Sequence, residues 1–305
     1  MENDYLSNPH DKFFKESFSR KEVVESFISE YLPGTISKQV DLSTLEILKD
    51  SFIDKELSEH LSDLLYRVKI AGKTSFLYLL FEHKSFPDSM THFQILRNKV
   101  KIWELYLKQN KNIRKLPVVI GLVIYHGDKK WIMKNSILPL FEEIEGTTHY
   151  IPDFRTEVLD ISHIPDDMIK GEIFLQVHFL IQKYIYSPQL FDKLPDIFML
   201  LKSLTEDRKK TEYMEILLRY LAASVDTVKK QDLKEEVKRA IDTGDALMTT
   251  IAEEWVQKGI GTGIEKGIEL VAEKSIRRDM TDEDIQAITG LTLKRIAEIR
   301  KRIGK

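Results

Sequence analysis

Two apolar runs separated by a short loop constrain the fold of this 305-residue chain more than any other feature. The runs cover residues 62–70 and 75–84, and Gly72 lies in the loop between them. Runs of this length and composition, interrupted at a glycine, are typical of two strands that a tight turn joins. The sequence therefore predicts a β-hairpin.

The segments on both sides of the hairpin predict helices and further strands. Residues 10–31 carry a loose apolar stripe that ends at Pro33-Gly34, as a helix would, and residues 40–49 alternate like a strand. Residues 91–109 are predicted to be helical because apolar residues recur there at spacings of three and four: Phe93, Leu96, Val100, Trp103 and Leu107.

An unbroken apolar run at 116–125 is typical of a strand that is covered on both faces. A shorter strand is expected around 157–161. Together with the hairpin, these elements predict an α/β fold class in which helices flank a mixed sheet.

After Pro165 the sequence predicts only helices, at 168–186, 189–204, 211–223 and 228–240. Residues 258–267 repeat Gly-Ile units and are interpreted as a hinge or a weak oligomerisation segment. The last stretch, 281–303, predicts two short helices capped by Thr281 and Thr292. We expect three parts: a domain at 1–164, a helical region at 165–245, and a linker with a helix-turn-helix-like tail at 246–305.

The composition excludes several classes of protein. Hydrophobic residues make up 42% and charged residues 31%, as in ordinary soluble proteins. The absence of cysteine excludes disulfides, thiolate zinc sites and a cysteine nucleophile. No apolar run approaches the roughly 18 residues of a membrane span, so a cytoplasmic protein without a membrane partner is expected. A net charge of −3 argues against a protein that coats DNA, but it allows a local basic patch.

The hairpin would bring two carboxylates together if Gly72 and Lys73 form a type II′ turn. In that register Asp63 lies directly opposite Glu82, with Cβ atoms roughly 5 Å apart. Lys84 follows two residues after Glu82 and belongs to the same face. The opposite face pairs only apolar residues and is predicted to be the core side: Leu64 with Phe81, Tyr66 with Leu79, and Val68 with Leu77.

Two interpretations of these residues remain open on geometry alone. Carboxylates in cross-strand register repel unless a cation binds between them, and a divalent cation with Lys84 could activate an attacking water. Alternatively, Asp63 and Glu82 are solvated strand-end residues that pair with Lys84. A change of register would also separate the two acids.

The flanking residues add a family resemblance. The following motifs occur in order along the chain: His10-Asp11-x-x-Phe14-Lys15, Tyr31-Leu32-Pro33, Asp63, Glu82-His83-Lys84-Ser85, Phe93-Gln94-x-Leu96-Arg97, Leu116-Pro117 and Tyr125-His126-Gly127. This order resembles the Rpn family of recombination-promoting nucleases, also described as transposase-like, within the PD-(D/E)XK nuclease superfamily. Ser62 stands where the motif name has proline.

The resemblance implies a restriction-endonuclease-like fold and a PD-(D/E)XK-like nuclease domain at 1–164. It implies an endonuclease that cleaves double-stranded DNA with Mg²⁺, or another divalent cation such as Mn²⁺, in recombination. Asp63 and Glu82 would be metal ligands with the His83 carbonyl, and Lys84 the catalytic lysine. Asp11 and Gln94 are candidate supporting residues. Asn98 stands where relatives often have tyrosine.

Other signals have two interpretations each. The basic stretch 97–115 could contact phosphates, through Arg97 and Lys101 for example, or could be a solvated helix face. The side chain of His83 is expected in the core, and His126 is expected in a loop. The tail could bind DNA or protein. A transposase that joins DNA ends and a non-catalytic DNA-binding protein are the alternative functions, and two-strand cleavage would favour a homodimer.

Overall fold

The computed structural model of the chain describes residues 8–48, 63–83, 87–204, 208–225, 230–240, 268–269, 271–278 and 280–303. The chain divides into two compact units, Met1–Asp242 and Thr243–Lys305. No helix among the described residues is long and apolar enough to cross a membrane.

The first unit contains a five-stranded mixed sheet in the order β1-β2-β3-β4-β5. The strands are β1 (Val40–Leu48), β2 (Asp63–Ile70), β3 (Lys73–His83), β4 (Val118–His126) and β5 (Thr156–Asp160). The first three strands pair antiparallel, whereas β3, β4 and β5 run parallel. The predicted hairpin is therefore β2–β3, and β3 lies at the centre of the sheet.

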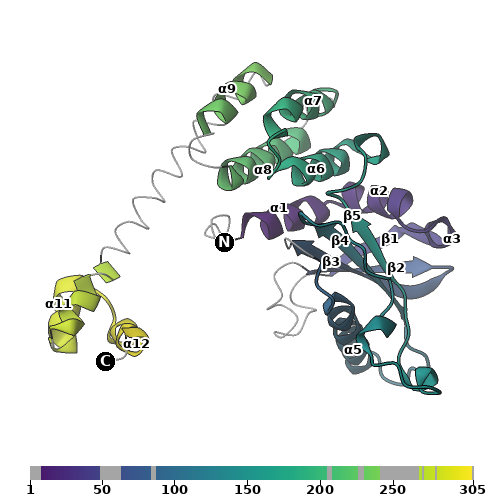
Figure 1. Cartoon of the computed structure of the whole chain (residues 1–305), viewed down its shortest axis with the longest axis horizontal. Coiled ribbons are helices and arrows are strands. Elements are labelled where there is room, and N and C mark those ends of the chain that lie inside the picture. Colours follow the sequence, from purple (N-terminus) through teal and green to yellow (C-terminus); the bar gives the residue numbers. More distant parts are fainter. Residues whose placement is uncertain are drawn as a thin grey trace. The chain divides into compact units, whose positions relative to one another are not determined.

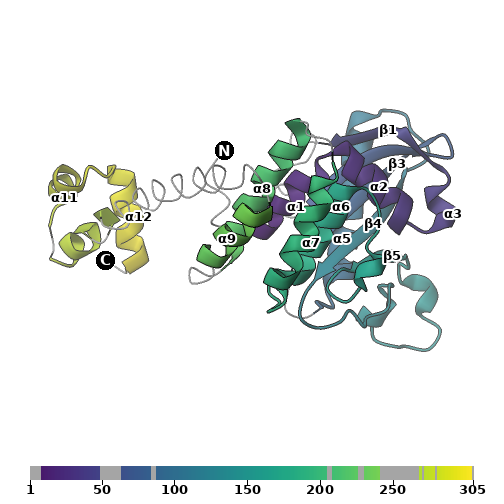
Figure 2. The same cartoon turned by 90° about the horizontal axis from the view of Figure 1, so that it is seen from above.

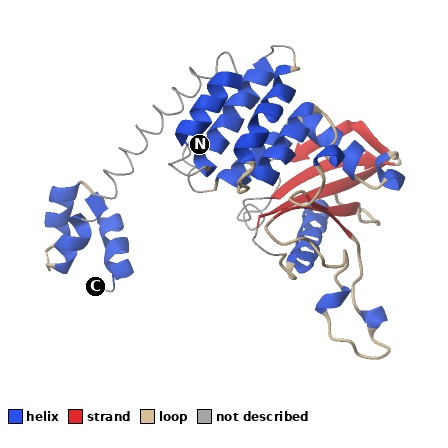
Figure 3. Ribbon diagram, turned by 45° about the horizontal axis from the view of Figure 1, so that its top comes forward, coloured by secondary structure: helices blue, strands red, loops and turns tan. Residues whose placement is uncertain are grey.

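Helices cover both faces of this sheet (Figures 1 and 3). The helices are α1 (Pro9–Phe18), α2 (Lys21–Tyr31), α3 (Gly34–Ser37), α5 (Thr91–Gln109), α6 (Ile173–Tyr184), α7 (Leu190–Lys202), α8 (Arg208–Ser224) and α9 (Lys230–Ala240). Helices α1 and α2 lie on one face, and α6, α7 and α8 pack beyond them side by side (Figure 2). Helix α5 lies on the other face. The mixed α/β sheet flanked by helices and followed by further helices is confirmed.

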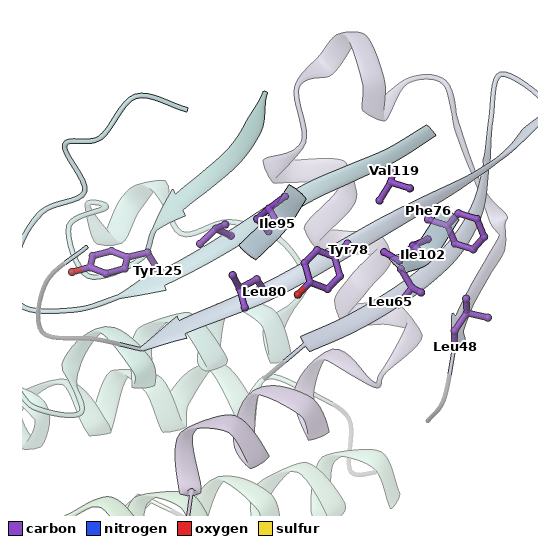
Figure 4. Close-up of a cluster of buried hydrophobic side chains, with 10 residues drawn as sticks. Leu48, Leu65, Phe76, Tyr78, Leu80, Ile95, Ile102, Val119 and Tyr125 are labelled. Carbon is purple, nitrogen blue, oxygen red and sulfur yellow. The ribbon is translucent and has the colours of Figure 1, made fainter. Parts of the chain in front are cut away.

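Alternation along β3 divides its side chains between two apolar layers. On the α1 side, the Phe81 ring stacks on Phe14 at 4.6 Å, and the buried Tyr66 hydroxyl donates to the Phe18 carbonyl at 2.8 Å. On the α5 side, even-numbered residues of β3 join a second buried cluster (Figure 4), which comprises Leu48, Leu65, Phe76, Tyr78, Leu80, Ile95, Ile102, Val119, Val123 and Tyr125. Both faces of the hairpin thus contribute to the core, which is why most residues of both strands are apolar.

Helix α5 has the predicted bounds, but most of the apolar residues that predicted it do not face the sheet. Its buried residues are Thr91, His92, Ile95, Asn98, Lys99 and Ile102. Phe93, Val100 and Leu107 are exposed. The helix approaches β4 closely at Gly121, where an added Cβ atom would lie only 2.6 Å from Cγ2 of Ile95.

The single helix predicted over residues 10–31 is wrong, because α1 ends at Phe18 and α2 begins at Lys21. The two helices share one packing partner and differ in the others. Both helices contact α6, but α1 also packs on α8 and on the hairpin, whereas α2 also packs on β1. A straight helix could not follow both sets of contacts.

The second unit contains the predicted helix pair, α11 (Asp282–Thr289) and α12 (Leu293–Ile303). The Thr281 and Thr292 hydroxyls accept hydrogen bonds from the backbone N–H groups of Asp284 and Arg295, as N-caps do. Its small core consists of Ala272, Ile276, Ile285, Ile296 and Ile299. The Gly-Ile stretch 258–267 lies outside the described residues.

The basic residues of α12 are largely matched by acids within the second unit. Arg300 pairs with Asp282 at 2.7 Å, and Arg302 pairs with Glu273 at 2.6 Å. Arg295 pairs with Glu269 and with Glu298. These ion pairs reduce the positive charge available for DNA and favour the protein-contact interpretation of the tail.

Candidate functional site

The candidate site lies at the carboxyl end of β3, where Glu82 is the next-to-last residue of the strand. Glu82 is only 5% exposed and lies on the α5 side of the sheet, in line with Tyr78 and Leu80. A carboxylate in such a position is costly to bury, so it is expected to serve a specific interaction. This strand end is therefore the starting point for the site.

The turn of the hairpin differs from the prediction by one residue. Ala71 and Gly72 form the two-residue turn, with φ values of 48° and 73°, and positive φ at both positions is the pattern of a type I′ turn. Ile70 consequently pairs with Lys73, and Asp63 pairs with Leu80. The prediction that Asp63 lies directly opposite Glu82 is wrong. Glu82 lies two residues farther along β3, so the two positions are diagonal neighbours.

Two further residues lie in register with Glu82 across the parallel strands. Glu82 pairs with Tyr125 on β4, and Tyr125 pairs with Asp160 on β5. In open α/β sheets, ligands bind at the carboxyl ends of parallel strands. The row Glu82–Tyr125–Asp160 is therefore located where a ligand would be expected. Figure 4 shows Tyr125 beyond Leu80 at this end of the cluster.

Several carboxylates lie near the Tyr125 hydroxyl at this end of the sheet. Burial raises the pKa of Tyr125 to about 12, and the carboxylates of Asp160, Asp128 and Glu82 contribute to the increase. The hydroxyl donates to the Lys129 carbonyl at 2.8 Å. Carboxylates thus concentrate negative charge around a buried tyrosine, and such a site favours cations.

Asp160 was not predicted as a site residue. Its Oδ2 accepts a hydrogen bond from the Trp131 backbone N–H at 2.9 Å, and its carboxylate contacts Nδ1 of His163 at 3.0 Å. The available signal was its place at the end of a predicted strand. The strand was predicted, but its parallel pairing beside β4 could not be inferred from the sequence.

A second group of polar residues lies at the same end of the sheet but on the α1 side. Nδ1 of His10 is hydrogen-bonded to the Tyr220 hydroxyl at 2.7 Å, and Nε2 is hydrogen-bonded to the Tyr186 hydroxyl. The His126 ring stacks on Tyr186 with centroids 5.9 Å apart. His126 was expected in a loop, but it is the last residue of β4 and is buried.

The predicted supporting residues occupy different faces. Asp11, on α1, is buried and accepts a hydrogen bond from the Asn8 side chain. Gln94 is half-buried near the amino end of α5. Asn98 is fully buried, and its amide donates to the Tyr78 hydroxyl at 2.5 Å, in the interior of the α5 layer. Asn98 therefore connects α5 to the middle of β3, several residues before the carboxyl end of that strand.

The basic stretch 97–115 is also divided by the fold. Arg97 is exposed and Lys101 is half-buried, so both remain candidates for phosphate contacts. Lys99 is 6% exposed and lies over the Phe154 ring, with Nζ 4.1 Å from the ring centroid. Lys99 cannot contact DNA from this position.

The predicted metal ligands are only partly visible. The side chains of Asp63 and His83 and the whole of Lys84 lie outside the described parts of the chain. Among the side chains that are described, no three histidine, aspartate or glutamate residues are placed to hold one metal ion. The proposed set of Asp63, Glu82 and His83 therefore stays a prediction.

The comparisons with known proteins agree with the sequence motifs. Residues 8–212 match the family model described as "Putative transposase, YhgA-like". Recombination-promoting nuclease RpnA of Escherichia coli K12 is 27% identical over 294 residues, which cover 95% of this chain and 97% of that protein.

Two further relatives come from the same strain. Recombination-promoting nuclease RpnC is 27% identical over 255 residues, covering 83% of each chain. The inactive recombination-promoting nuclease-like protein RpnE is 27% identical over 293 residues, covering 94% of this chain and 95% of that protein. No solved structure matches the chain with statistical significance. On the family model and these relatives, the chain belongs to the Rpn family, which the YhgA-like transposase model describes.

Proposed function

We propose that this protein is a metal-dependent DNA endonuclease that hydrolyses phosphodiester bonds and acts in recombination. The observation that carries the proposal is the buried Glu82 at the carboxyl end of β3, with Tyr125 and Asp160 beside it on the parallel strands. The names of RpnA and RpnC support nuclease activity, whereas the inactive RpnE makes a direct test necessary.

The donor set suits a hard divalent cation. Mg²⁺ prefers carboxylate, carbonyl and water oxygens, and the Glu82 carboxylate is the described member of such a set. Asp63 is the diagonal neighbour of Glu82 in the strand register, and the His83 carbonyl is adjacent. When bound, Mg²⁺ or Mn²⁺ would stabilise the negative charge that develops on the phosphate.

The protein's own residues supply the remaining functions. Lys84, immediately after β3, would orient the attacking water or accept its proton. Asp160 and the Tyr125 hydroxyl hold the Lys129–Trp131 backbone through hydrogen bonds, and this fixes the loop after β4 beside the site. Arg97 and Lys101 would contact the DNA backbone. Gln94 and Asp11 would support the site from α5 and α1.

A plasmid-nicking assay with and without Mg²⁺ tests the proposal. Glu82→Gln and Asp63→Asn should each lower the nicking rate at least about 100-fold, the size of loss seen when one charge-stabilising group is removed. Glu157→Gln is the matched control, because Glu157 lies near the amino end of β5, pairs with Arg155, and is away from the carboxyl ends of the strands where the site lies. Its rate should stay within about twofold of wild type.

Calorimetric titration with Mg²⁺ gives a readout that does not need turnover. Wild type should bind the cation, and Glu82→Gln should weaken binding while the thermal melt stays cooperative. Full nicking activity in Glu82→Gln would refute the assigned site. DNA binding without any cleavage would support the non-catalytic alternative, and strand-joined products would support a transposase.

A further inference from the structure

Helix α5 carries a second apolar face that the sheet does not cover. We define the outer stripe as Phe93, Leu96, Val100, Trp103 and Leu107. Phe93 is 47% exposed, Val100 42% and Leu107 47%, whereas Leu96 and Trp103 are half-buried. Large apolar side chains in a continuous row on a helix surface are unusual for a solvated face and indicate a contact.

The spacing of the outer stripe is that of a helix that pairs with another helix. Its members recur at intervals of three, four, three and four residues, which is the a/d pattern of a coiled coil. The buried residues Ile95, Asn98 and Ile102 fall between them and face the sheet. One helix thus presents an inner face for its own core and an outer face toward solvent, with Trp103 at the border, because its side chain also packs against the buried cluster.

The outer stripe is nearly symmetric about Val100. Leu96 and Trp103 lie four and three residues from this centre, and Phe93 and Leu107 lie seven residues on either side. Two copies of α5 that run antiparallel across a two-fold axis at Val100 would place Phe93 of one copy against Leu107 of the other. A two-fold interface requires this kind of self-complementary surface.

The charges beside the outer stripe have the same symmetry. Arg97 lies three residues before Val100 and Glu104 four residues after it, and both are exposed. In the antiparallel pair, Arg97 of each copy would therefore lie beside Glu104 of the other. This complementarity argues for a second copy rather than an unrelated apolar partner.

Exposed apolar residues next to the helix enlarge the surface. Leu116 is 50% exposed and Val118 62%, at the start of β4. The Trp103 indole N–H donates to the Pro117 carbonyl at 2.8 Å, which brings this segment beside the outer stripe. An α5 of 19 residues is about 28 Å long. Leu116 and Val118 therefore extend the apolar surface that a second copy could cover.

We propose that the outer stripe of α5 is the homodimer interface, in which α5 pairs antiparallel with α5 of a second copy. The proposal goes beyond the function above and does not depend on it, because its evidence and its test concern association alone.

Sedimentation equilibrium of the full chain, over a wide range of concentration, tests the proposal. Wild type should form dimers, and Val100→Glu should raise the dimer Kd at least tenfold, because two like charges would meet at the two-fold axis. Gln109→Glu is the matched control, since it adds the same charge at an exposed position of α5 outside the stripe. Its Kd should change less than about threefold.

Charge reversal identifies the antiparallel arrangement. Arg97→Glu and Glu104→Arg should each weaken the dimer, and the double variant should recover most of the wild-type Kd. Arg97 is also a candidate phosphate contact, but loss of a phosphate contact would not be rescued by Glu104→Arg.

Three results would overturn the proposal. Wild type could be a monomer at all concentrations, which would leave the outer stripe to another protein or to another segment of this chain. A dimer unaffected by Val100→Glu would locate its interface elsewhere. A double variant no tighter than the single variants would exclude antiparallel pairing. Circular dichroism melts should show that all variants fold, since each change is at an exposed residue.

Discussion

Lys99 should destabilise the protein at neutral pH, so replacing it with methionine should stabilise the fold. The residue is 6% exposed between α5 and the sheet, and its Cε atom lies 3.4 Å from where a Cβ atom at Gly121 would be. The Lys99 Nζ atom makes a cation–π contact with the Phe154 ring, 4.1 Å from the ring centroid. Burial lowers the pKa of Lys99 from 10.5 to about 8.

The sign and the size follow from proton binding. Between pH 8 and about 10.5 the unfolded chain holds a proton on Lys99 that the folded chain has lost, so the stability of the fold rises with pH in this window. Below pH 8 the full cost of the buried charge applies, roughly 3 kcal/mol at most. The Phe154 ring and the remaining solvent contact reduce this by about 1–2 kcal/mol. We expect Lys99→Met to stabilise the protein by about 1–2 kcal/mol at pH 7.

Urea denaturation at pH 7 and pH 10 measures the effect. The advantage of Lys99→Met over wild type should shrink to about 0.5 kcal/mol at pH 10, because the wild-type lysine then folds without its charge. Lys108→Met, at an exposed position of the same helix, should stay within about 0.5 kcal/mol of wild type at both pH values. A difference between Lys99→Met and wild type that is independent of pH would refute the reasoning.

Three further predictions concern buried residues of the first unit. Burial lowers the pKa of His178 to about 3, so below pH 6.5 wild type should lose stability that His178→Leu retains, about 2 kcal/mol by pH 5 in urea titrations. Gly121→Ala should cost about 1–3 kcal/mol in thermal melts, and Ile95→Ala in the same chain should remove most of the added strain; additive costs would contradict the contact. Tyr66→Phe should cost about 1–2 kcal/mol, because the Phe18 carbonyl loses its buried donor, and an unchanged melting temperature would argue against that bond.

Local patterns predicted much of this fold. The periodicity of 91–109 gave the bounds of α5, and the two threonine caps were predicted correctly because a cap depends on residues within one turn. The break between α1 and α2 was missed because it depends on tertiary packing partners, α8 for α1 and β1 for α2. Local patterns also could not predict which side of α5 faces the sheet, because this helix has apolar residues on two sides.

Only part of the site could be predicted, because local patterns do not show which distant residues become neighbours. Glu82 could be located from the hairpin and from the family motif, and the structure shows it buried at a strand end. Tyr125 and Asp160 become its neighbours only through the parallel pairing of β3, β4 and β5. Parallel strands are separated by long connections, so no turn rule gives their register. His126 was wrongly expected in a loop, and His10 was given no role. Both depend on distant tyrosines: Tyr220 of α8 and Tyr186 after α6 bond to His10, and Tyr186 also stacks on His126.

The error in the hairpin turn has a limited effect on the proposed chemistry. The turn was assigned to Gly72 and Lys73 because glycine suits the first position of a type II′ turn, whereas Ala71 adopts a positive φ that is unfavourable for alanine. The partner of each β2 residue consequently moves by two positions on β3, from Glu82 to Leu80 for Asp63.

Because side chains alternate with a period of two, a displacement of two positions leaves every residue on its expected face. Positions 63 and 82 become diagonal neighbours in the register, and such neighbours in a sheet are about 7–8 Å apart instead of roughly 5 Å. In the proposed metal site, the longer side chain of Glu82 would have to span the added distance toward the shared cation. A displacement of one position would have placed Glu82 and Asp63 on opposite faces. The proposed metal site therefore depends on the parity of the register and not on direct opposition of the two carboxylates.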